Sequence, residues 1–152
     1  MNKSAFLMPV LLVLAVSAQA QQPPACPQLP ASAGLIWEHR SGGGADICRA
    51  LRENGTEAFG MYIASESPFS PNRRNREEQG VIDGREIHWY RAEIAAQPNV
   101  QARETLLELD DGRVAHIWLQ AHSDAELAAA FSATRDMRLR PDRGSSQVAS
   151  GQ

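Results

Sequence analysis

Four histidines are the residues of this sequence best suited to acid–base or metal chemistry: His39, His88, His116 and His122. Alternating side chains along 84–94 (GREIHWYRAEI) and 113–121 indicate strands, so His88 and His116 are expected on adjacent strands. Paired imidazoles would suit zinc or a small periplasmic hydrolase. The spacing matches no HxH, HExxH or CxxC motif, and a histidine in a strand beside Trp or Tyr is more often a half-buried structural residue.

Glutamates on the predicted strands offer a second kind of chemistry, a paired acid and base. The candidates are Glu86, Glu93, Glu104 and Glu108. Two of them would need to be brought together by strand pairing. Arginines alternate with these glutamates, which also predicts cross-strand ion pairs without a catalytic role. No GxSxG motif is present. We therefore predict no catalytic residue, no cofactor and no metal ligand.

The stretch 65–79 (SESPFSPNRRNREEQ) is predicted to be a long exposed loop, because prolines and polar residues interrupt the strand pattern. It carries the candidate partner-binding residues Phe69, Arg73, Arg74 and Arg76. Planar guanidinium groups recognise carboxylate or phosphate, and a neighbouring ring adds apolar contact. The alternative is a solvated loop whose positive charge is partly cancelled by Glu77 and Glu78.

The N-terminus has the pattern of a secretory signal peptide over 1–20. An apolar run at 5–16 follows Lys3, and Ala18-Gln19-Ala20 is a small-x-small cleavage site. Export to an oxidising compartment and an even cysteine count predict a disulfide between Cys26 and Cys48. The protein is thus expected to be periplasmic or secreted.

Composition limits the remaining classes of function. The chain has 152 residues and a formal net charge of −3, and Lys3 is its only lysine. A mildly acidic chain is a poor candidate for nucleic-acid binding. No segment after the signal is apolar enough to span a membrane, so no integral membrane segment is expected after cleavage.

The elements that must position these residues are predicted to be strands and one helix. Hairpin turns are indicated at Asn54-Gly55, Asp83-Gly84 and 110–112, whereas the triple glycine at 42–44 indicates a flexible connection. A capping box at 123–126 begins a helix over about 124–135. We expect an α+β fold with an antiparallel sheet of five or six strands, built from hairpins, and this late helix packed on one face.

The domain organisation follows from the same pattern. A Pro-rich leader over 21–33 precedes a single domain over 34–140, and a disordered tail follows over 141–152. Within the domain, 84–94 carries apolar bulk on both faces, which predicts a central strand covered on both sides.

The order of elements over 59–139 supports a resemblance. The sequence reads FGMYIASESPF, a polar loop, VIDGREIHWY, and ETLLELDDGRVAHIWLQAHSDAELAAAFSATRDMRL. This resembles the PsbP-like group, which includes small bacterial envelope proteins similar to DcrB. The resemblance implies a sandwich used for binding or assembly, without catalytic residues. The cysteine pair and the glycine run depart from that group.

The sequence thus predicts an exported, non-enzymatic binding or accessory protein of the bacterial cell envelope. An inhibitor or immunity-type protein is a specific form of this prediction, with another envelope or secreted protein as the partner. The alternative function is a small periplasmic hydrolase or metal-binding protein that uses His88 and His116.

Overall fold

The computed structural model describes residues 25–92, 97 and 99–139, so the predicted signal peptide and tail lie outside the described residues. The strands are β1 (Ile36–Gly42), β2 (Ala45–Leu51), β3 (Glu57–Ala64), β4 (Arg76–Ile82), β5 (Arg85–Arg91), β6 (Gln101–Glu108) and β7 (Val114–Ala121). The helices are α1 (Asp124–Asp136) and two single 3-10 turns, η1 (Ala31–Ala33) and η2 (Arg73–Asn75).

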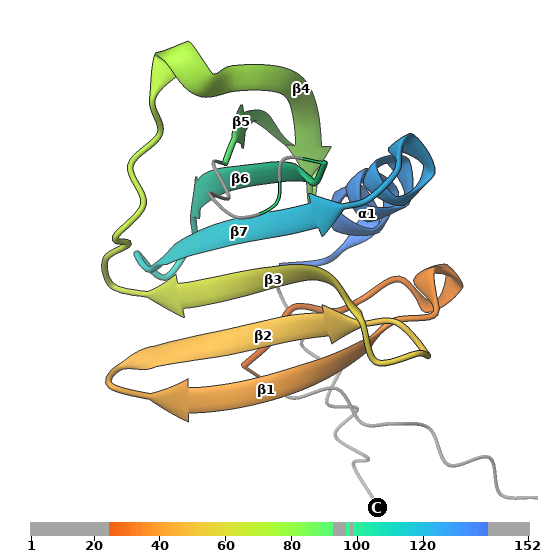
Figure 1. Cartoon of the computed structure of the whole chain (residues 1–152). Coiled ribbons are helices and arrows are strands. Elements are labelled where there is room, and N and C mark those ends of the chain that lie inside the picture. The colour runs from red at the N-terminus through yellow and green to blue at the C-terminus, as the bar shows by residue number, and fades with distance from the viewer. Residues whose placement is uncertain (1–24, 93–96, 98, 140–152) are drawn as a thin grey trace, which may run out of the picture.

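The strands form one antiparallel sheet in the order β1-β2-β3-β7-β6-β5-β4 (Figure 1). Two meanders, β1–β3 and β4–β7, meet where β3 pairs with β7. The connection after β3 therefore runs from the middle of the sheet to its far edge, where β4 begins (Figure 1).

The sheet confirms the predicted α+β class but has seven strands instead of five or six. The additional strand is β4, whose first four residues were assigned to the loop over 65–79. Its sequence, REEQGVI, is rich in charge, and only Ile82 is buried. An edge strand that buries almost no side chain does not need alternating apolar residues, so the sequence carries no pattern that would predict it.

The hairpin turns form where the sequence indicates them, but the glycine run, predicted to be a flexible connection, is a further tight hairpin turn. Gly43 and Gly44 have φ values of 62° and 81°, and Asp83 and Gly84 have values of 48° and 76°. Positive φ at both central residues is the type I′ geometry that matches strand twist. The triple glycine is thus a two-residue hairpin turn between β1 and β2, and Gly42 belongs to β1 itself.

The core lies between α1 and one face of the sheet. Phe59, Met61, Ile117 and Leu119 are fully buried on this face. The helix presents Leu127, Ala130, Ala133 and Thr134 to them. Ser123 caps the helix by accepting a hydrogen bond from the Glu126 backbone, as predicted. Each large side chain removed from water in this way contributes about 1.5–3 kcal/mol.

The predicted Cys26–Cys48 disulfide is present, with a Cα–Cα distance of 5.9 Å. Leu29 is buried beside it, and the Trp37 indole donates a 2.6 Å hydrogen bond to the Pro27 carbonyl. In the chain-entropy model a bridge across such a loop contributes about 3 kcal/mol. The described end of the predicted leader is therefore part of the packed domain.

The strand β5 differs from the prediction of a central strand covered on both sides. It lies next to the edge strand β4. Trp89 is buried, and its ring lies 5.3 Å from that of Phe131 on α1. His88 and Tyr90 are only half-buried, on the opposite face. The apolar bulk at 88 and 90 is aromatic, and such rings sit at a partly exposed surface as readily as in a core.

Candidate functional site

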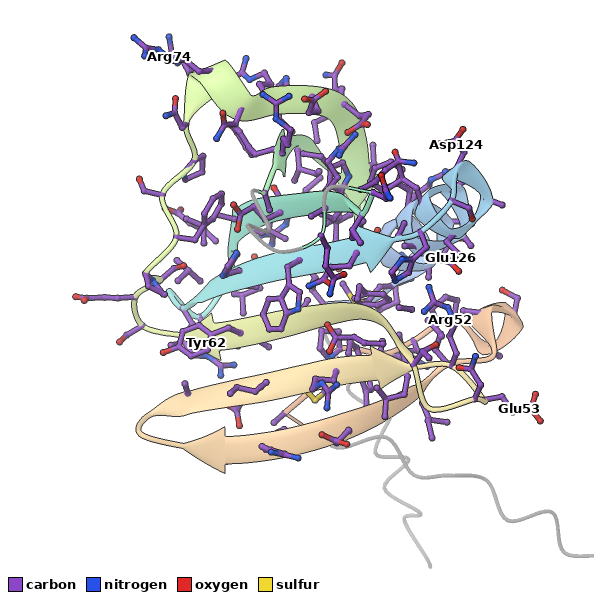
Figure 2. All side chains as sticks on the ribbon, viewed as in Figure 1. Arg52, Glu53, Tyr62, Arg74, Asp124 and Glu126 are labelled. Atoms are coloured by element: carbon purple, nitrogen blue, oxygen red, sulfur yellow. A yellow bond between two sulfur atoms is a disulfide. The ribbon has the colours of Figure 1, made fainter. Side chains whose placement is uncertain are left out.

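The sheet face opposite α1 carries no α-helix among the described residues, and we call it the open face. One row of cross-strand neighbours spans all seven strands of this face. The row consists of Glu38, Arg49, Gly60, Trp118, Glu104, Tyr90 and Arg76. Figure 2 shows Tyr62 near the end of β3, where the β3–β4 connection leaves the sheet, and Arg74 at the far end of that connection.

An aromatic cluster of Phe69, Tyr90, His116 and Trp118 lies on the open face. The Phe69 ring stacks on the His116 ring with centroids 4.7 Å apart and planes inclined by 16°. Tyr90 makes an edge contact with Phe69 at 6.3 Å, and Trp118 lies 5.6 Å from His116. Phe69 comes from the β3–β4 connection, so this contact fixes the connection against the sheet.

Trp118 lies over Gly60, its cross-strand neighbour on β3. A Cβ atom at position 60 would lie 2.3 Å from the indole, so only glycine leaves room for the ring. The indole Nε1 donates a 2.8 Å hydrogen bond to Glu57, whose other oxygen accepts a 2.7 Å hydrogen bond from Arg49. These contacts hold a large aromatic side chain on the open face in one orientation.

The histidines are not arranged as a metal site. The strand β6 lies between β5 and β7, so the expectation that His88 and His116 occupy adjacent strands is wrong. His116 instead bonds Glu104, with Nε2 and Oε2 3.0 Å apart. Within residues 25–92, 97 and 99–139, no group of three or more His, Cys, Asp or Glu side chains is placed to bind a metal ion.

A serine, a histidine and an aspartate do meet, at the β1–β2 hairpin. His39 Nε2 lies 2.9 Å from Asp46 Oδ1 and 3.2 Å from Ser41 Oγ. In a hydrolase triad the acid and the nucleophile bind different ring nitrogens. Here one nitrogen faces both, and the Ser41 hydroxyl donates directly to Asp46 at 2.5 Å. The Ser41 hydrogen bond, followed by that of His39, lowers the pKa of the Asp46 carboxyl. These hydrogen bonds therefore stabilise the β1–β2 hairpin.

The three candidate acid–base glutamates that the structure describes are not paired with one another. Glu86 lies opposite Val81, Glu104 opposite Tyr90 and Trp118, and Glu108 opposite Val114. Glu93 lies outside the described residues. The predicted cross-strand ion pairs do occur in this sheet, as in the contact of Arg49 with Glu57. Of the described candidates, Glu104 contacts His116 and not an arginine, so the arginine–glutamate ion pairs of this sheet are formed by other glutamates.

The three loop arginines form a cationic corner, which we call the arginine corner: Arg73, Arg74 and Arg76. Their side chains are exposed, and Figure 2 shows Arg74 pointing away from the ribbon. In the described part of the chain, no carboxylate lies within ion-pair distance of these three guanidinium groups.

The acidic residues expected to cancel this charge are engaged elsewhere. Glu77 pairs with Arg91 at 3.7 Å. Glu78 accepts two hydrogen bonds of 2.7 Å from Arg103, and these lower the pKa of its carboxyl. Among the described residues, no carboxylate therefore compensates the positive charge of the arginine corner, and Arg76 lies directly opposite Tyr90 of the aromatic cluster.

A polar hollow of about 480 Å³ opens at the opposite end of the molecule, between the β2–β3 turn and the start of α1. Arg52 and Glu126, both labelled in Figure 2, line it. Arg52 donates to the Glu57 carbonyl at 2.7 Å, and Glu126 accepts from the His122 backbone at 2.8 Å. Because these charged groups already have partners within the chain, the hollow is a weaker candidate than the arginine corner.

Comparison with known proteins adds no relative: no family model, no curated protein and no solved structure matches this chain. The resemblance to the PsbP-like group stays a prediction. No helix in the described part of the chain is long and apolar enough to cross a membrane.

Sequence reasoning found the arginine corner and Phe69 but missed the remainder of the open face. Phe69 was expected to be an apolar contact for a partner, and it lies half-buried against His116. Trp118 and Gly60 were not singled out as site residues. The usable signal was the alternation along β7, which places His116 and Trp118 together on the less apolar face.

Proposed function

We propose that this chain is an exported, non-enzymatic binding protein of the bacterial cell envelope that recognises an acidic segment of another envelope or secreted protein. The observation that carries the proposal is the arginine corner, which has three exposed guanidinium groups without a carboxylate partner among the described residues. Free arginine forks favour carboxylates in planar, bidentate geometry.

The aromatic cluster beside the arginine corner supports the same proposal. Binding surfaces are enriched in arginine and aromatic side chains, because rings contribute area with little loss of conformational freedom. Arg76 and Tyr90 are cross-strand neighbours, so cationic and aromatic contacts are available to one ligand at once. An inhibitor or immunity-type protein, which blocks an acidic surface of its target, is a specific form of this function.

The signal-like N-terminus and the disulfide support export. Disulfides persist in the periplasm and outside the cell and are rare in the cytosol. The Cys26–Cys48 bridge connects the N-terminal segment to β2, so an oxidising compartment would stabilise the domain.

A binding experiment with a glutamate-rich peptide tests the proposal. We expect Arg73→Ala/Arg74→Ala/Arg76→Ala to weaken binding at least about tenfold, since each charge-assisted hydrogen bond contributes about 1.5–3 kcal/mol. The variant with all three arginines replaced by lysine keeps the positive charge but loses the planar guanidinium groups. It should bind the peptide less tightly than the wild type and more tightly than the triple alanine variant. The exposed Arg135, on α1, is the control for removal of a surface charge.

A natural partner can then be sought in a periplasmic extract with the same variants. A captured protein that the triple alanine variant no longer retains, and that Arg135→Ala still retains, would support the proposal. Equal retention by wild type and the triple alanine variant would remove the arginine corner from the binding site.

A further inference from the structure

The two edges of the sheet differ in how they are protected. Edge strands expose unpaired backbone N–H and C=O groups and are commonly protected by bulges, prolines or charged side chains, especially lysines. The β4 edge has a register irregularity between Arg76 and Gln79. The β1 edge has an unbroken register with β2, from Ile36 opposite Leu51 to Gly42 opposite Ala45, and contains no proline or lysine.

An apolar side chain is exposed along this regular edge. Ile36, the first residue of β1, has 56% of its surface exposed, the largest fraction of any large hydrophobic side chain in the described part of the chain. On the neighbouring strand and the same face, Ile47 is 37% exposed. The β1 edge therefore combines free backbone groups with exposed apolar surface.

The charges of β1 are self-complementary. If a second β1 strand pairs antiparallel with the first about a twofold axis at His39, Glu38 of each copy lies opposite Arg40 of the other. The same register places Ile36 opposite Gly42 and Trp37 opposite Ser41. Sliding the strands by two residues would place Glu38 opposite Glu38 or Arg40 opposite Arg40, and like charges directly opposite are unfavourable. A shift of one residue would place the side chains of the open face of one copy beside those of the helix-covered face of the other.

We propose that β1 is a homotypic docking edge, through which two copies of this chain pair about a twofold axis at His39 and join their sheets into one. The proposal is independent of the proposed function. Twofold dimers with self-complementary interfaces are the commonest oligomers. The axis is perpendicular to the sheet, so the open faces of both copies would lie on one side of the dimer, with an arginine corner at each outer end.

The occupant is a second copy because the charge pattern satisfies itself. An extended peptide from another protein could also pair with an edge strand. Nothing in β1 selects such a peptide, whereas the spacing of Glu38 and Arg40 selects its own reversed sequence. Arg40 is largely exposed, and its 3.2 Å contact with Glu38 of the same strand is a surface ion pair that leaves the guanidinium accessible.

Sedimentation equilibrium of the purified, disulfide-bonded chain over a concentration series tests this pairing. Arg40→Glu places an acidic residue opposite Glu38 of the partner copy at both symmetry-related positions, and Glu38→Arg likewise places a basic residue opposite Arg40. We expect either variant alone to dissociate at least about tenfold more readily than the wild type. Mixed in equal amounts, the two variants are complementary across the twofold axis and should form a heterodimer about as stable as the wild-type dimer.

The mixture of the two variants distinguishes loss of contacts between two copies from loss of contacts within one chain. Glu38 also contacts Arg49 at 3.0 Å, so circular dichroism and thermal unfolding must show that Glu38→Arg is folded. Ile36→Lys, at an exposed edge position, provides a variant that leaves this contact intact and should also weaken the dimer. A wild type that stays monomeric throughout, a dimer insensitive to Arg40→Glu, or a mixture that does not associate would each overturn the proposal.

Discussion

The two faces of the sheet are made by the same strands but differ in the burial and hydrogen bonding of their side chains. On the helix-covered face, Phe59 and its neighbours are sealed from water and touch one another. On the open face, Trp118 and His116 stay half-exposed, and each donates or accepts a hydrogen bond with a glutamate. Adjacent residues such as Phe59 and Gly60 belong to different faces, so single substitutions can test each face separately.

The largest effect is expected on the helix-covered face. Phe59→Ala should lower the free energy of unfolding by about 3–5 kcal/mol, because it leaves a cavity among fully buried side chains. Urea denaturation with circular dichroism measures this difference. Val81→Ala, where the side chain is 40% exposed, is the control and should change stability by less than about 0.5 kcal/mol. Similar losses for both variants would mean that the two faces do not differ as described.

The next effect is on the open face, one residue along β3. Gly60→Ala should cost about 1–3 kcal/mol, because the added methyl group lies 2.3 Å from the Trp118 indole and the ring must move. In the Trp118→Ala background the same change should cost less than about 0.5 kcal/mol. Gly42→Ala, where a Cβ meets no atom within 4 Å, is the matched control. A cost that persists without Trp118 would contradict the steric explanation.

A smaller effect is expected where the β3–β4 connection contacts the open face. Phe69→Ala should lower stability by about 0.5–1.5 kcal/mol through loss of the ring contact with His116. The freed connection should also be cut faster by trypsin at Arg73 and Arg74, which mass spectrometry can follow. Phe69→Tyr keeps the ring and should preserve the wild-type rate. Equal cleavage of Phe69→Ala and wild type would show that the stack does not hold the connection.

The smallest effect concerns the ion pair at the border of the helix-covered face. The hydrogen bonds from Arg103 lower the pKa of the Glu78 carboxyl in the folded state. The ion pair therefore makes its full contribution to the free energy of unfolding above the ordinary glutamate pKa of 4.5. This contribution is lost as the pH falls through the lower pKa of Glu78 in the folded state. Glu78 is 37% exposed, so after solvent screening the contribution is less than about 1 kcal/mol.

Unfolding midpoints measured between pH 7 and pH 2 test this dependence. Glu78→Gln should reduce the loss of stability on acidification, whereas Glu66→Gln, at an exposed loop position, should leave it unchanged. If wild type and Glu78→Gln lose the same stability on acidification, the Glu78–Arg103 ion pair does not contribute to the pH dependence.

Local signals in the sequence predicted the local structure well. The Asp83-Gly84 turn, the Ser123 cap and the Cys26–Cys48 bridge each depend on a short motif or on an even cysteine count, and each is present. The strand β4 was missed because it buries only Ile82 and so has no apolar alternation to detect. Backbone pairing at an edge requires no particular side chain, and composition alone does not reveal it.

The candidate site was harder to predict because it depends on pairing between distant strands. The contact of β3 with β7 brings Gly60 under Trp118, and no local pattern selects that register over another. The stack of Phe69 on His116 likewise joins a loop to a strand far along the chain. The arginine corner, in contrast, is contiguous in sequence and was therefore visible from the start.

The short bridge between Gln28 and Arg138 has a practical consequence. Their backbones exchange hydrogen bonds of 2.8 and 2.9 Å, so the described chain enters and leaves the domain at adjoining points. Both points border the core-facing side that holds Cys26 and Met137. A sensor chip or an affinity resin coupled through a tag placed directly before residue 25 or directly after residue 139 would therefore display the open face outward. The same short separation makes the domain suitable for a permuted chain with its old ends spliced and new ones cut at the Asn54-Gly55 turn.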